Sequence, residues 1–361
     1  MGKALSTFIK ALLIEPPSLS LDDFARALRL IFDGEANDIE TASFLTAIRL
    51  RKIDFDSEFI ATAVETILEY SDTIDASSVA REGYIDIVGT GGDSQNTFNV
   101  STSAAIVGAG MGLKVCKHGG KASTSTSGSG DLMSELGVKL MKVNAETTPI
   151  IVGDSNLCFL FAPAFHHGMG KVVNVRKNLG IPTIFNILGP LLNPIPLKAR
   201  ILGVYTETLG ETYCKAAIKS DKKKGRVPAN TMVVYGEIGL DEISPIGKTK
   251  VWKYNKTNDS IDTFTISPED FGLPEHSLDL VRSGLAVENA RVLKDILSNK
   301  VDTLPGHNPL VDYILLNASA LAVVGGLTND WKQGVKLASD AIISGAALRA
   351  LDTFVASVDR L

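Results

Sequence analysis

The sequence contains little cysteine and no excess of positive charge. Its 361 residues include only three cysteines, Cys116, Cys158 and Cys214, and no two of them form a Cys-x-x-Cys pattern. Their odd number and wide spacing favour reduced thiols in a cytosolic protein over a disulfide framework. The net charge of −5 gives no overall basic footprint for nucleic acid. We therefore predict a cytoplasmic protein that binds no nucleic acid.

Long hydrophobic runs are also missing. No apolar stretch reaches the roughly 20 residues that a membrane-spanning helix requires. The longest runs, at residues 156–165 and 313–324, have the length of core elements, and an apolar content of 45% is sufficient for a large core. The sequence thus predicts no membrane association, and its length predicts roughly two domains.

The common nucleotide-binding motifs are absent as well. Walker A requires Gly-x-x-x-x-Gly-Lys followed by Ser or Thr, and no such spacing occurs. A dinucleotide-binding loop requires a third glycine three residues after Gly91, where this sequence has Ser94. We therefore expect a phosphate ligand to be a phosphorylated sugar and not a dinucleotide.

The sequence does contain a glycine-rich turn between a strand and a helix. Residues 84–88 form a short apolar run typical of a buried strand, and residues 89–93, Gly-Thr-Gly-Gly-Asp, follow as a tight turn. Residues 99–102, Asn-Val-Ser-Thr, have the composition of an N-cap and begin a helix of small residues that reaches Met111. Unpaired N–H groups and the helix dipole would point the same way there, so this stretch predicts an anion site.

A second loop follows a strand expected at residues 113–116. It begins with Lys117 and His118, carries six hydroxyl side chains, and leads into another helix at Asp131. A Gly/Ser-rich run of this kind can be a flexible linker. Its place between a strand and a helix, with two cations at its start, favours a polyphosphate clamp instead.

The rest of the chain separates into a helical and an alternating part. Residues 1–76 have the spacing of four amphipathic helices, with Ser20 and Asp56 as expected N-caps, and show no strand pattern. From residue 77 to 361, strand patterns alternate with helical ones, which indicates a mainly parallel sheet covered by helices. The expected fold class is α/β, with a small N-terminal helical bundle domain and a larger domain around the central sheet.

Three finer expectations concern the larger part. Residues 156–164 have the composition of one buried strand. The basic run at residues 219–226 is typical of a solvated loop. Residues 248–267 alternate polar and β-prone side chains, which predicts an antiparallel addition to the sheet.

Several separate motifs carry a family resemblance. The turn at residues 89–93, the Asn-Val-Ser-Thr at residues 99–102 and the Lys-His-Gly at residues 117–119 resemble the phosphoribosyl-diphosphate loops of the anthranilate phosphoribosyltransferases. The match extends from about residue 5 to the C-terminus. It implies transfer of the 5-phosphoribosyl group from phosphoribosyl diphosphate to the amine of anthranilate, a step of tryptophan biosynthesis. It also implies Mg²⁺ as cofactor, and a homodimer formed through a helical domain that helices from about residues 170–196 complete.

The resemblance assigns most of both loops to phosphoribosyl diphosphate. No side chain is expected to act as a dedicated base, because catalysis needs charge stabilisation on pyrophosphate and orientation of an amine that is already neutral. The residues assigned to phosphoribosyl diphosphate are Gly89, Gly91, Gly92, Asp93, Thr97, Asn99, Val100, Ser101, Thr102, Lys117, His118, Gly119, Gly120, Lys121, Ser123, Ser125 and Ser129.

The pair Asp241 and Glu242 is the best candidate for holding a hard cation. It follows an expected strand at residues 232–235. Mg²⁺ is usually held by one or two carboxylates together with substrate phosphates. Such pairs are common on protein surfaces, so the stronger argument is its match to the metal-binding pair of the family. The resemblance adds Ser101 as a third ligand.

Four residues are assigned to anthranilate. Arg176, on a helix expected at residues 171–179, suits a planar carboxylate, although a surface position is the commoner fate of an arginine. His166 precedes a second histidine, but adjacent side chains do not share a helix face, so a zinc site is disfavoured. A pocket-lining histidine and a histidine merely hydrogen-bonded at a strand end are both open interpretations. Gly89 and Gly120 complete the set by resemblance.

The chain departs from the family at Gly120 and Lys121, where most members have Asn-Arg. Gly120 has no side chain to replace the asparagine that contacts anthranilate in the family. A second glycine after Gly119 also predicts a positive φ at position 120, which asparagine tolerates and β-branched residues do not.

Two other functions stay open. A pyrimidine-nucleoside phosphorylase shares this architecture, but the Lys-x-Ser loop with an arginine that marks its family is not found. A nucleic-acid-binding protein of phosphoribosyltransferase-like fold would need a basic patch, which the net charge of −5 opposes.

Overall fold

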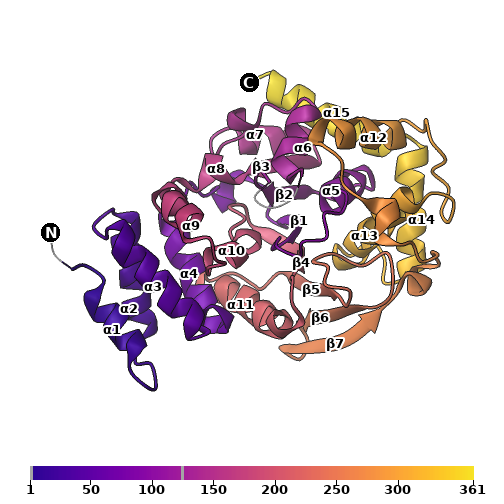
Figure 1. Ribbon diagram of the computed structural model, residues 1–361. Coiled ribbons are helices and arrows are strands. Elements are labelled where there is room, and N and C mark those ends of the chain that lie inside the picture. Colours follow the sequence, from indigo (N-terminus) through magenta and orange to yellow (C-terminus); the bar gives the residue numbers. More distant parts are fainter. Residues whose placement is uncertain (1–2, 123–125) are drawn as a thin grey trace.

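A seven-stranded sheet forms the centre of the larger domain in the computed structural model, which describes residues 3–122 and 126–361 (Figure 1). The strand order is β3-β2-β1-β4-β5-β6-β7. The first five strands are parallel, and β6 and β7 are added antiparallel, as expected for residues 248–267. The strands are β1 Tyr84–Gly89, β2 Val115–Gly119, β3 Leu157–Phe161, β4 Leu197–Gly203, β5 Asn230–Gly236, β6 Thr249–Asn255 and β7 Ser260–Ile266.

The parallel strands are largely buried because helices cover both sides of the sheet. β3 is buried at every position, and β2 is buried at its first four positions. The paired residues Cys116 and Cys158 lie side by side in these two strands, and all three cysteines are free thiols. The chain builds β1, β2 and β3 in one direction and then returns to β4 and β5 on the other side of β1. Ligands of such sheets bind outside the carboxyl ends of the strands, where the order reverses.

One face of the sheet packs against a layer of helices that closes the main hydrophobic core. Gly110 lets α5 cross α15 closely, since a Cβ there would lie 2.6 Å from Ala347 Cα. α14 and α15 are joined at Gly345 with a bend of 63°. The helices on this side are α5 Val100–Gly110, α6 Ser129–Glu135, α7 Thr148–Asp154, α12 Ala286–Leu297, α13 Pro309–Val324, α14 Trp331–Ile343 and α15 Ala346–Asp359.

The N-terminal helices build a second core beside the sheet domain (Figure 1). Both expected N-caps are confirmed: the Ser20 hydroxyl accepts from Asp23 N at 3.1 Å, and the Asp56 carboxylate accepts from Glu58 N at 2.8 Å. The four helices are α1 Ser6–Leu13, α2 Leu21–Phe32, α3 Asp38–Leu50 and α4 Ser57–Glu69.

Residues from the middle of the chain share this second core. Val172, Phe185 and Leu188 are buried in the same cluster as the side chains of α1 to α4. They belong to the segment of α8 Ala162–Phe165, α9 Val173–Leu179 and α10 Phe185–Leu188, and α11 Gly210–Lys223 joins α4 to the sheet. The predicted fold class is confirmed. The domain division at residues 76 and 77, with a contribution from about 170–196, stays a prediction.

The strand expected at residues 156–164 is shorter than predicted. It ends at Phe161, and α8 begins at once with Ala162. Pro163 explains the difference, because it has no N–H for a sheet ladder and is well suited to the first turn of a helix. The early end places the following His166 at the edge of the sheet.

The basic run at residues 219–226 is not the solvated loop that was predicted. α11 continues to Lys223, and Lys222 and Lys223 make exposed ion pairs with neighbouring carboxylates. Asp221 is buried and lies 2.7 Å from Arg200 of β4. The run therefore anchors the end of α11 to the sheet. Within the described part of the chain, no single helix is long and apolar enough to cross a membrane, and α14 and α15 reach that length only as a bent pair.

Candidate active site

A cleft of about 400 Å³ opens at the carboxyl ends of β1 and β2, beside the point where the strand order reverses. The turn after β1, the loop after β2 and the turn after β5 meet there. Of the predicted site residues, those that line the cleft are Gly89, Gly91, Gly92, Asp93, Thr97, Asn99, Ser101, Thr102, Lys117, His118, Gly119, Gly120, Lys121, Ser129, Arg176, Asp241 and Glu242.

The remaining predicted residues lie elsewhere. Val100 is fully buried in the first turn of α5, so only its backbone could face a ligand. His166 is buried behind His118 and is not part of the cleft wall. Ser123 and Ser125 are outside the described residues, so their assignment to phosphoribosyl diphosphate stays a prediction.

The glycine turn after β1 is held against the acidic pair. Gly91 N donates a hydrogen bond to Asp241 Oδ2 at 2.5 Å. A Cβ on Gly89 would collide with the Asp241 carboxylate, so only glycine permits this approach. Gly91 and Gly92 both have positive φ, +72° and +85°, and a Cβ on either would meet open space. The turn therefore presents bare backbone to the cleft.

Three carboxylates crowd one part of the cleft. Burial, followed by the nearby Asp93 carboxylate, raises the pKa of Asp241 to about 7. Burial, followed by Asp241, raises the pKa of Glu242 well above its usual value, while Lys117 and a hydrogen bond from Ser101 act in the opposite direction.

These carboxylates fit a divalent cation. No described group of three or more His, Cys, Asp or Glu side chains is arranged to hold a metal ion alone. Asp241 and Glu242 are hard oxygen donors whose raised pKa values indicate that their surroundings do not fully compensate the negative charge of the pair. Mg²⁺ bound to a diphosphate needs only one or two protein carboxylates. A divalent cation would satisfy both acids, so the predicted set of Ser101, Asp241 and Glu242 is consistent with the geometry.

The start of the second loop lies deep in the structure. Lys117 is buried, and its Nζ donates to Ile87 O at 2.5 Å. Burial lowers the pKa of the Lys117 amine, against the attraction of the Asp86 carboxylate and of the acidic pair. Asp86 is fully buried, and burial raises its pKa to about 6. The Lys117 charge is thus fixed at the floor of the cleft, near both glycine loops.

The hydroxyl-rich part of the second loop is anchored by asparagines. Asn99 does not cap α5 with its side chain. Its Nδ2 donates to Ser127 O at 2.8 Å, and its Oδ1 accepts from Asn289 Nδ2 at 2.9 Å. Asn96 Oδ1 likewise accepts from Thr126 N at 3.1 Å. Asn289 was missed in the sequence because no motif links α12 to Asn99, 190 residues earlier in the chain. Asn96 was missed because its contact with Thr126 spans 30 residues.

Two histidines form a chain of contacts beneath the cleft. His118 Nε2 lies 3.0 Å from His166 Nε2, and His166 Nδ1 lies 2.9 Å from Ser71 Oγ. Burial lowers the pKa of His118 well below its usual value and that of His166 to about 4. Both rings are therefore neutral near pH 7. His166 contacts His118 and does not line the cleft. This arrangement is closer to a hydrogen-bonded histidine near a strand end than to a pocket-lining histidine.

Arg176 is the cleft residue best suited to bind a carboxylate. It lies on α9, and its guanidinium stands 5.9 Å from the centre of the Phe185 ring. Its Nε is buried, and no hydrogen-bond partner for it occurs among the described residues. Burial lowers the pKa of this guanidinium, since no neighbouring carboxylate compensates it. An anionic ligand would restore the missing partner.

The predicted positive φ at Gly120 is wrong. Its backbone lies outside the left-handed region, and a Cβ placed there would meet no atom within 4 Å. Gly119 is the restricted position, because a Cβ on it would collide with Ser129 Oγ. Two consecutive glycines thus reflect one steric requirement and not two.

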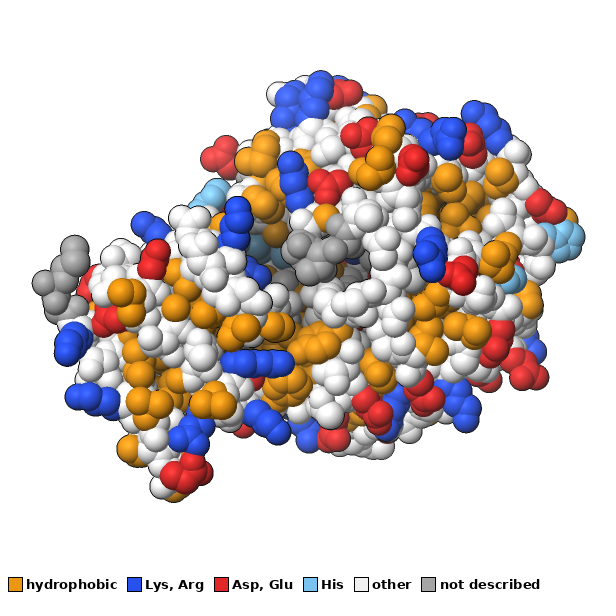
Figure 2. Space-filling view, viewed as in Figure 1, with side chains coloured by type: hydrophobic (Ala, Val, Ile, Leu, Met, Phe, Trp, Pro, Cys, Tyr) orange, Lys and Arg blue, Asp and Glu red, His pale blue; other side chains and the backbone are white. Residues whose placement is uncertain are grey.

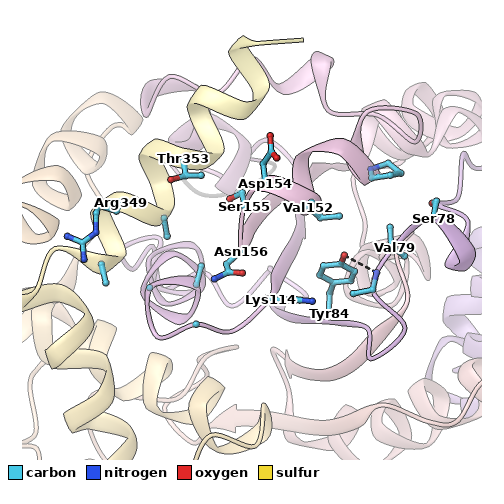
Figure 3. Close-up of a pocket in the computed structure, with 18 residues that line it drawn as sticks. Ser78, Val79, Tyr84, Lys114, Val152, Asp154, Ser155, Asn156, Arg349 and Thr353 are labelled. Atoms are coloured by element: carbon cyan, nitrogen blue, oxygen red, sulfur yellow. Dashed lines mark hydrogen bonds between the residues drawn. The ribbon is translucent and has the colours of Figure 1, made fainter.

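A larger cavity, of about 570 Å³, lies at the opposite ends of β1, β2 and β3 (Figure 3). Its charged side chains already have partners. Lys114 Nζ is 2.6 Å from Glu82, Asp154 is 2.8 Å from Arg360, and Arg349 donates to a backbone carbonyl at 2.9 Å. This cavity contains none of the predicted site residues, so volume alone does not identify the functional site.

Comparison with known proteins agrees with the cleft. Residues 81–348 match the a/b domain of a glycosyl transferase family, and residues 6–71 match its helical bundle domain. The chain is 46% identical to anthranilate phosphoribosyltransferase of Saccharomyces cerevisiae, with 99% of both chains covered. The chain belongs to the anthranilate phosphoribosyltransferases.

Solved structures of the yeast anthranilate phosphoribosyltransferase extend the match. Its complex with PRPP and Mg superposes with a TM-score of 0.91 at 46% identity, covering 99% of this chain and 98% of that one. Its complex with 4-fluoroanthranilate gives a TM-score of 0.90 at 44% identity, with the same coverage. The predicted family, enzyme class and Mg²⁺ cofactor are thereby confirmed. Neither the nucleoside phosphorylase nor the nucleic-acid-binding alternative gains support.

Proposed function

We propose that the cleft transfers the 5-phosphoribosyl group from phosphoribosyl diphosphate to the amine of anthranilate and releases pyrophosphate. The observation that carries this proposal is the meeting of two bare glycine loops, an uncompensated acidic pair and an unpaired arginine in one cleft. Each feature suits a different chemical group of the two substrates. The yeast relative, solved with PRPP and Mg and with 4-fluoroanthranilate, supports the same division.

The diphosphate is expected to lie between the two glycine loops. The turn after β1 and the first turn of α5 line the cleft, and backbone N–H groups there would suit phosphate oxygens. Lys117 supplies a buried positive charge near them. Asp241 and Glu242, with Ser101, would hold Mg²⁺, which neutralises the charge that develops on the leaving pyrophosphate.

Anthranilate is expected at the Arg176 end of the cleft. A guanidinium binds a planar carboxylate through two parallel hydrogen bonds, which fixes both position and orientation. Gly120 has open space beside it, Gly89 lines the cleft, and the neutral His118 ring, supported by His166, lines the same cleft. The aromatic amine needs no deprotonation before attack. The protein then acts by orientation and by stabilising charge.

We also propose a cytoplasmic homodimer formed through the helical domain. Ile39 and Leu50 of α3 are 80% and 74% exposed, and Leu13 and Ile14 at the end of α1 are 61% and 52% exposed. Hydrophobic side chains lie on the visible face of this domain, and basic and acidic side chains are interspersed over the whole face (Figure 2). Exposed apolar side chains of this kind are typical of an interface. The alternating charge does not favour nucleic acid.

The test of the reaction is direct. Adding phosphoribosyl diphosphate and Mg²⁺ to the purified protein with anthranilate should remove the anthranilate fluorescence, with one pyrophosphate released per anthranilate consumed. The controls omit phosphoribosyl diphosphate or replace anthranilate with benzoate, which lacks the amine. Phosphorolysis of thymidine without anthranilate consumption would overturn the proposal in favour of a nucleoside phosphorylase.

A further inference from the structure

Helix α13 lies directly behind the turn that carries Asp241 and Glu242. Asn317 of α13 is fully buried, and its amide satisfies both backbone groups of Ile243, the residue after Glu242. Ile243 N donates to Asn317 Oδ1 at 3.3 Å, and Asn317 Nδ2 donates to Ile243 O at 3.3 Å. Asn317 Nδ2 also donates to Tyr313 O at 3.1 Å, within α13 itself. The side chain therefore ties the turn to the helix at both polar groups of one residue.

A second connection joins the same turn to the start of α13. His276 Nε2 lies 2.7 Å from Asp312 Oδ2, and His276 N donates to Pro245 O at 2.8 Å. Asp312 Oδ1 accepts from Gly306 N at 2.8 Å, so each oxygen of this carboxylate has a partner. Residues 243 and 245 are thus both connected to α13, within four residues of the acidic pair.

Tyr313 lies one helical turn before Asn317 and faces the same acids. It is fully buried, and its hydroxyl has no partner in hydrogen-bonding geometry among the described residues. Burial raises the pKa of the Tyr313 phenol well above its usual value, and the nearby Glu242 carboxylate raises it further.

We infer that α13 is a positioning element for the metal-binding pair, and that Asn317 is its principal residue. Asp241 is buried, Glu242 is half-buried, and both line the cleft as neighbouring carboxylates that repel each other. A fixed support behind the turn would hold both carboxylates in place. Neither Asn317 nor Tyr313 is among the described residues that line the cleft, so both act on the site through the turn. Groups of this kind commonly set the affinity of the ligands they support.

This inference rests on the proposed function in one respect, the assignment of Mg²⁺ to Asp241 and Glu242. Asn317→Leu removes all three hydrogen bonds while keeping the number and branching of the side-chain heavy atoms. Asn317→Ser is the second variant because its smaller side chain admits water. Ser319→Ala is the matched control. Ser319 is equally buried on the same helix and donates to Trp331 O at 2.6 Å, away from the turn.

The expected result is a weaker metal site with the catalytic step retained. Asn317→Leu should need at least about tenfold more Mg²⁺ for half-maximal rate, with kcat at saturating Mg²⁺ within about threefold of the parent and KM for anthranilate unchanged. Free Mn²⁺ measured by EPR with phosphoribosyl diphosphate present should show the same loss of affinity. Without metal, the Ile243 amide should exchange faster with deuterium in Asn317→Leu and Asn317→Ser, but not in Ser319→Ala.

Two results would overturn the inference. Unchanged Mn²⁺ affinity in a folded Asn317 variant would remove Asn317 from metal positioning. Equal losses in Asn317→Ser and Ser319→Ala would show a general packing effect of α13. The proposed function fails separately: if Asp241→Asn and Glu242→Gln keep the parental Mg²⁺ dependence, the metal assignment itself is wrong. If those two variants lose it while Asn317→Leu does not, only the role of α13 is wrong.

Discussion

A cavity lies at each end of the parallel sheet, and the smaller of the two contains the groups suited to binding and catalysis. The cavity at the amino ends of β1 to β3 is the larger, about 570 Å³, but its lysine, aspartate and arginine side chains already have partners (Figure 3). The cleft at the carboxyl ends, about 400 Å³, contains bare backbone, an acidic pair with raised pKa values and an arginine whose Nε has no hydrogen-bond partner among the described residues. Unsatisfied charge, more than volume, distinguishes the site.

The contrast has a physical cause in the direction of the strands. Successive N–H groups and the amino ends of following helices gather at the carboxyl edge of a parallel sheet, and there the turns need no side chains to bind anions. At the opposite edge the connections arrive from helix carboxyl ends, whose carbonyl groups favour cations. The cationic side chains there already have hydrogen-bond or ion-pair partners, as the contact of Arg349 with a backbone carbonyl illustrates.

The strongest test of the contrast compares carboxylates from the two ends. Asp241→Asn and Glu242→Gln should each lower kcat on the order of a hundredfold or more, because the cation that stabilises the leaving pyrophosphate loses a ligand. Asp154→Asn, in the larger cavity, should stay within about twofold, since Asp154 forms only an exposed ion pair with Arg360. Steady-state rates across a Mg²⁺ titration measure all three. Parental metal dependence in both cleft variants would contradict the assignment.

A second test compares arginines. Arg176→Ala should raise KM for anthranilate and spare that for phosphoribosyl diphosphate, because a two-point carboxylate contact is lost. The expected cost is about 1.5–3 kcal/mol, or roughly 10- to 150-fold in kcat/KM. Arg349→Ala is the matched control from the other cavity and should change neither constant. A variant at Arg176 that loses only phosphoribosyl diphosphate affinity would place this residue at the other end of the cleft.

In the absence of metal, Asp241 should make the free energy of unfolding depend on pH. Folding raises the pKa of Asp241 from 3.8 to about 7, so its stabilising contribution is complete below pH 3.8 and is lost as the pH rises through about 7. Asparagine cannot ionise. Asp241→Asn should therefore gain stability relative to the parent between pH 5 and pH 8, measured by urea unfolding in EDTA. A difference that is constant with pH would show that Asp241 keeps its ordinary pKa.

The sequence predicted features that are local in the chain. The glycine turn, the strand before it and the N-caps at Ser20 and Asp56 depend on neighbouring residues, and each occurs as expected. The contact of Gly91 with Asp241 joins residues 150 positions apart, so no local pattern reveals it. Asn289 was missed for the same reason. The basic run at residues 219–226 was wrongly predicted to be a solvated loop. Its charged side chains pair with groups from other parts of the chain, which the local sequence does not show.

The smallest expected effect concerns Gly120, where the chain departs from its family. Its φ is not left-handed, and a Cβ there meets open space, so the backbone at this position does not require glycine. Gly120→Asn should therefore stay active within about tenfold, roughly 1.4 kcal/mol on the barrier. Gly120→Val should match it in thermal stability, contrary to the expectation from two successive glycines.

The control for position 120 is its neighbour. Gly119→Ala should lose far more activity, because a Cβ there collides with Ser129 Oγ and displaces the start of the hydroxyl-rich loop. Kinetics of the three variants with each substrate separate the possibilities. A valine at 120 that is stable but raises KM for anthranilate alone would show that the open space belongs to the substrate. A valine that unfolds the protein would show that the backbone at 120 is constrained after all.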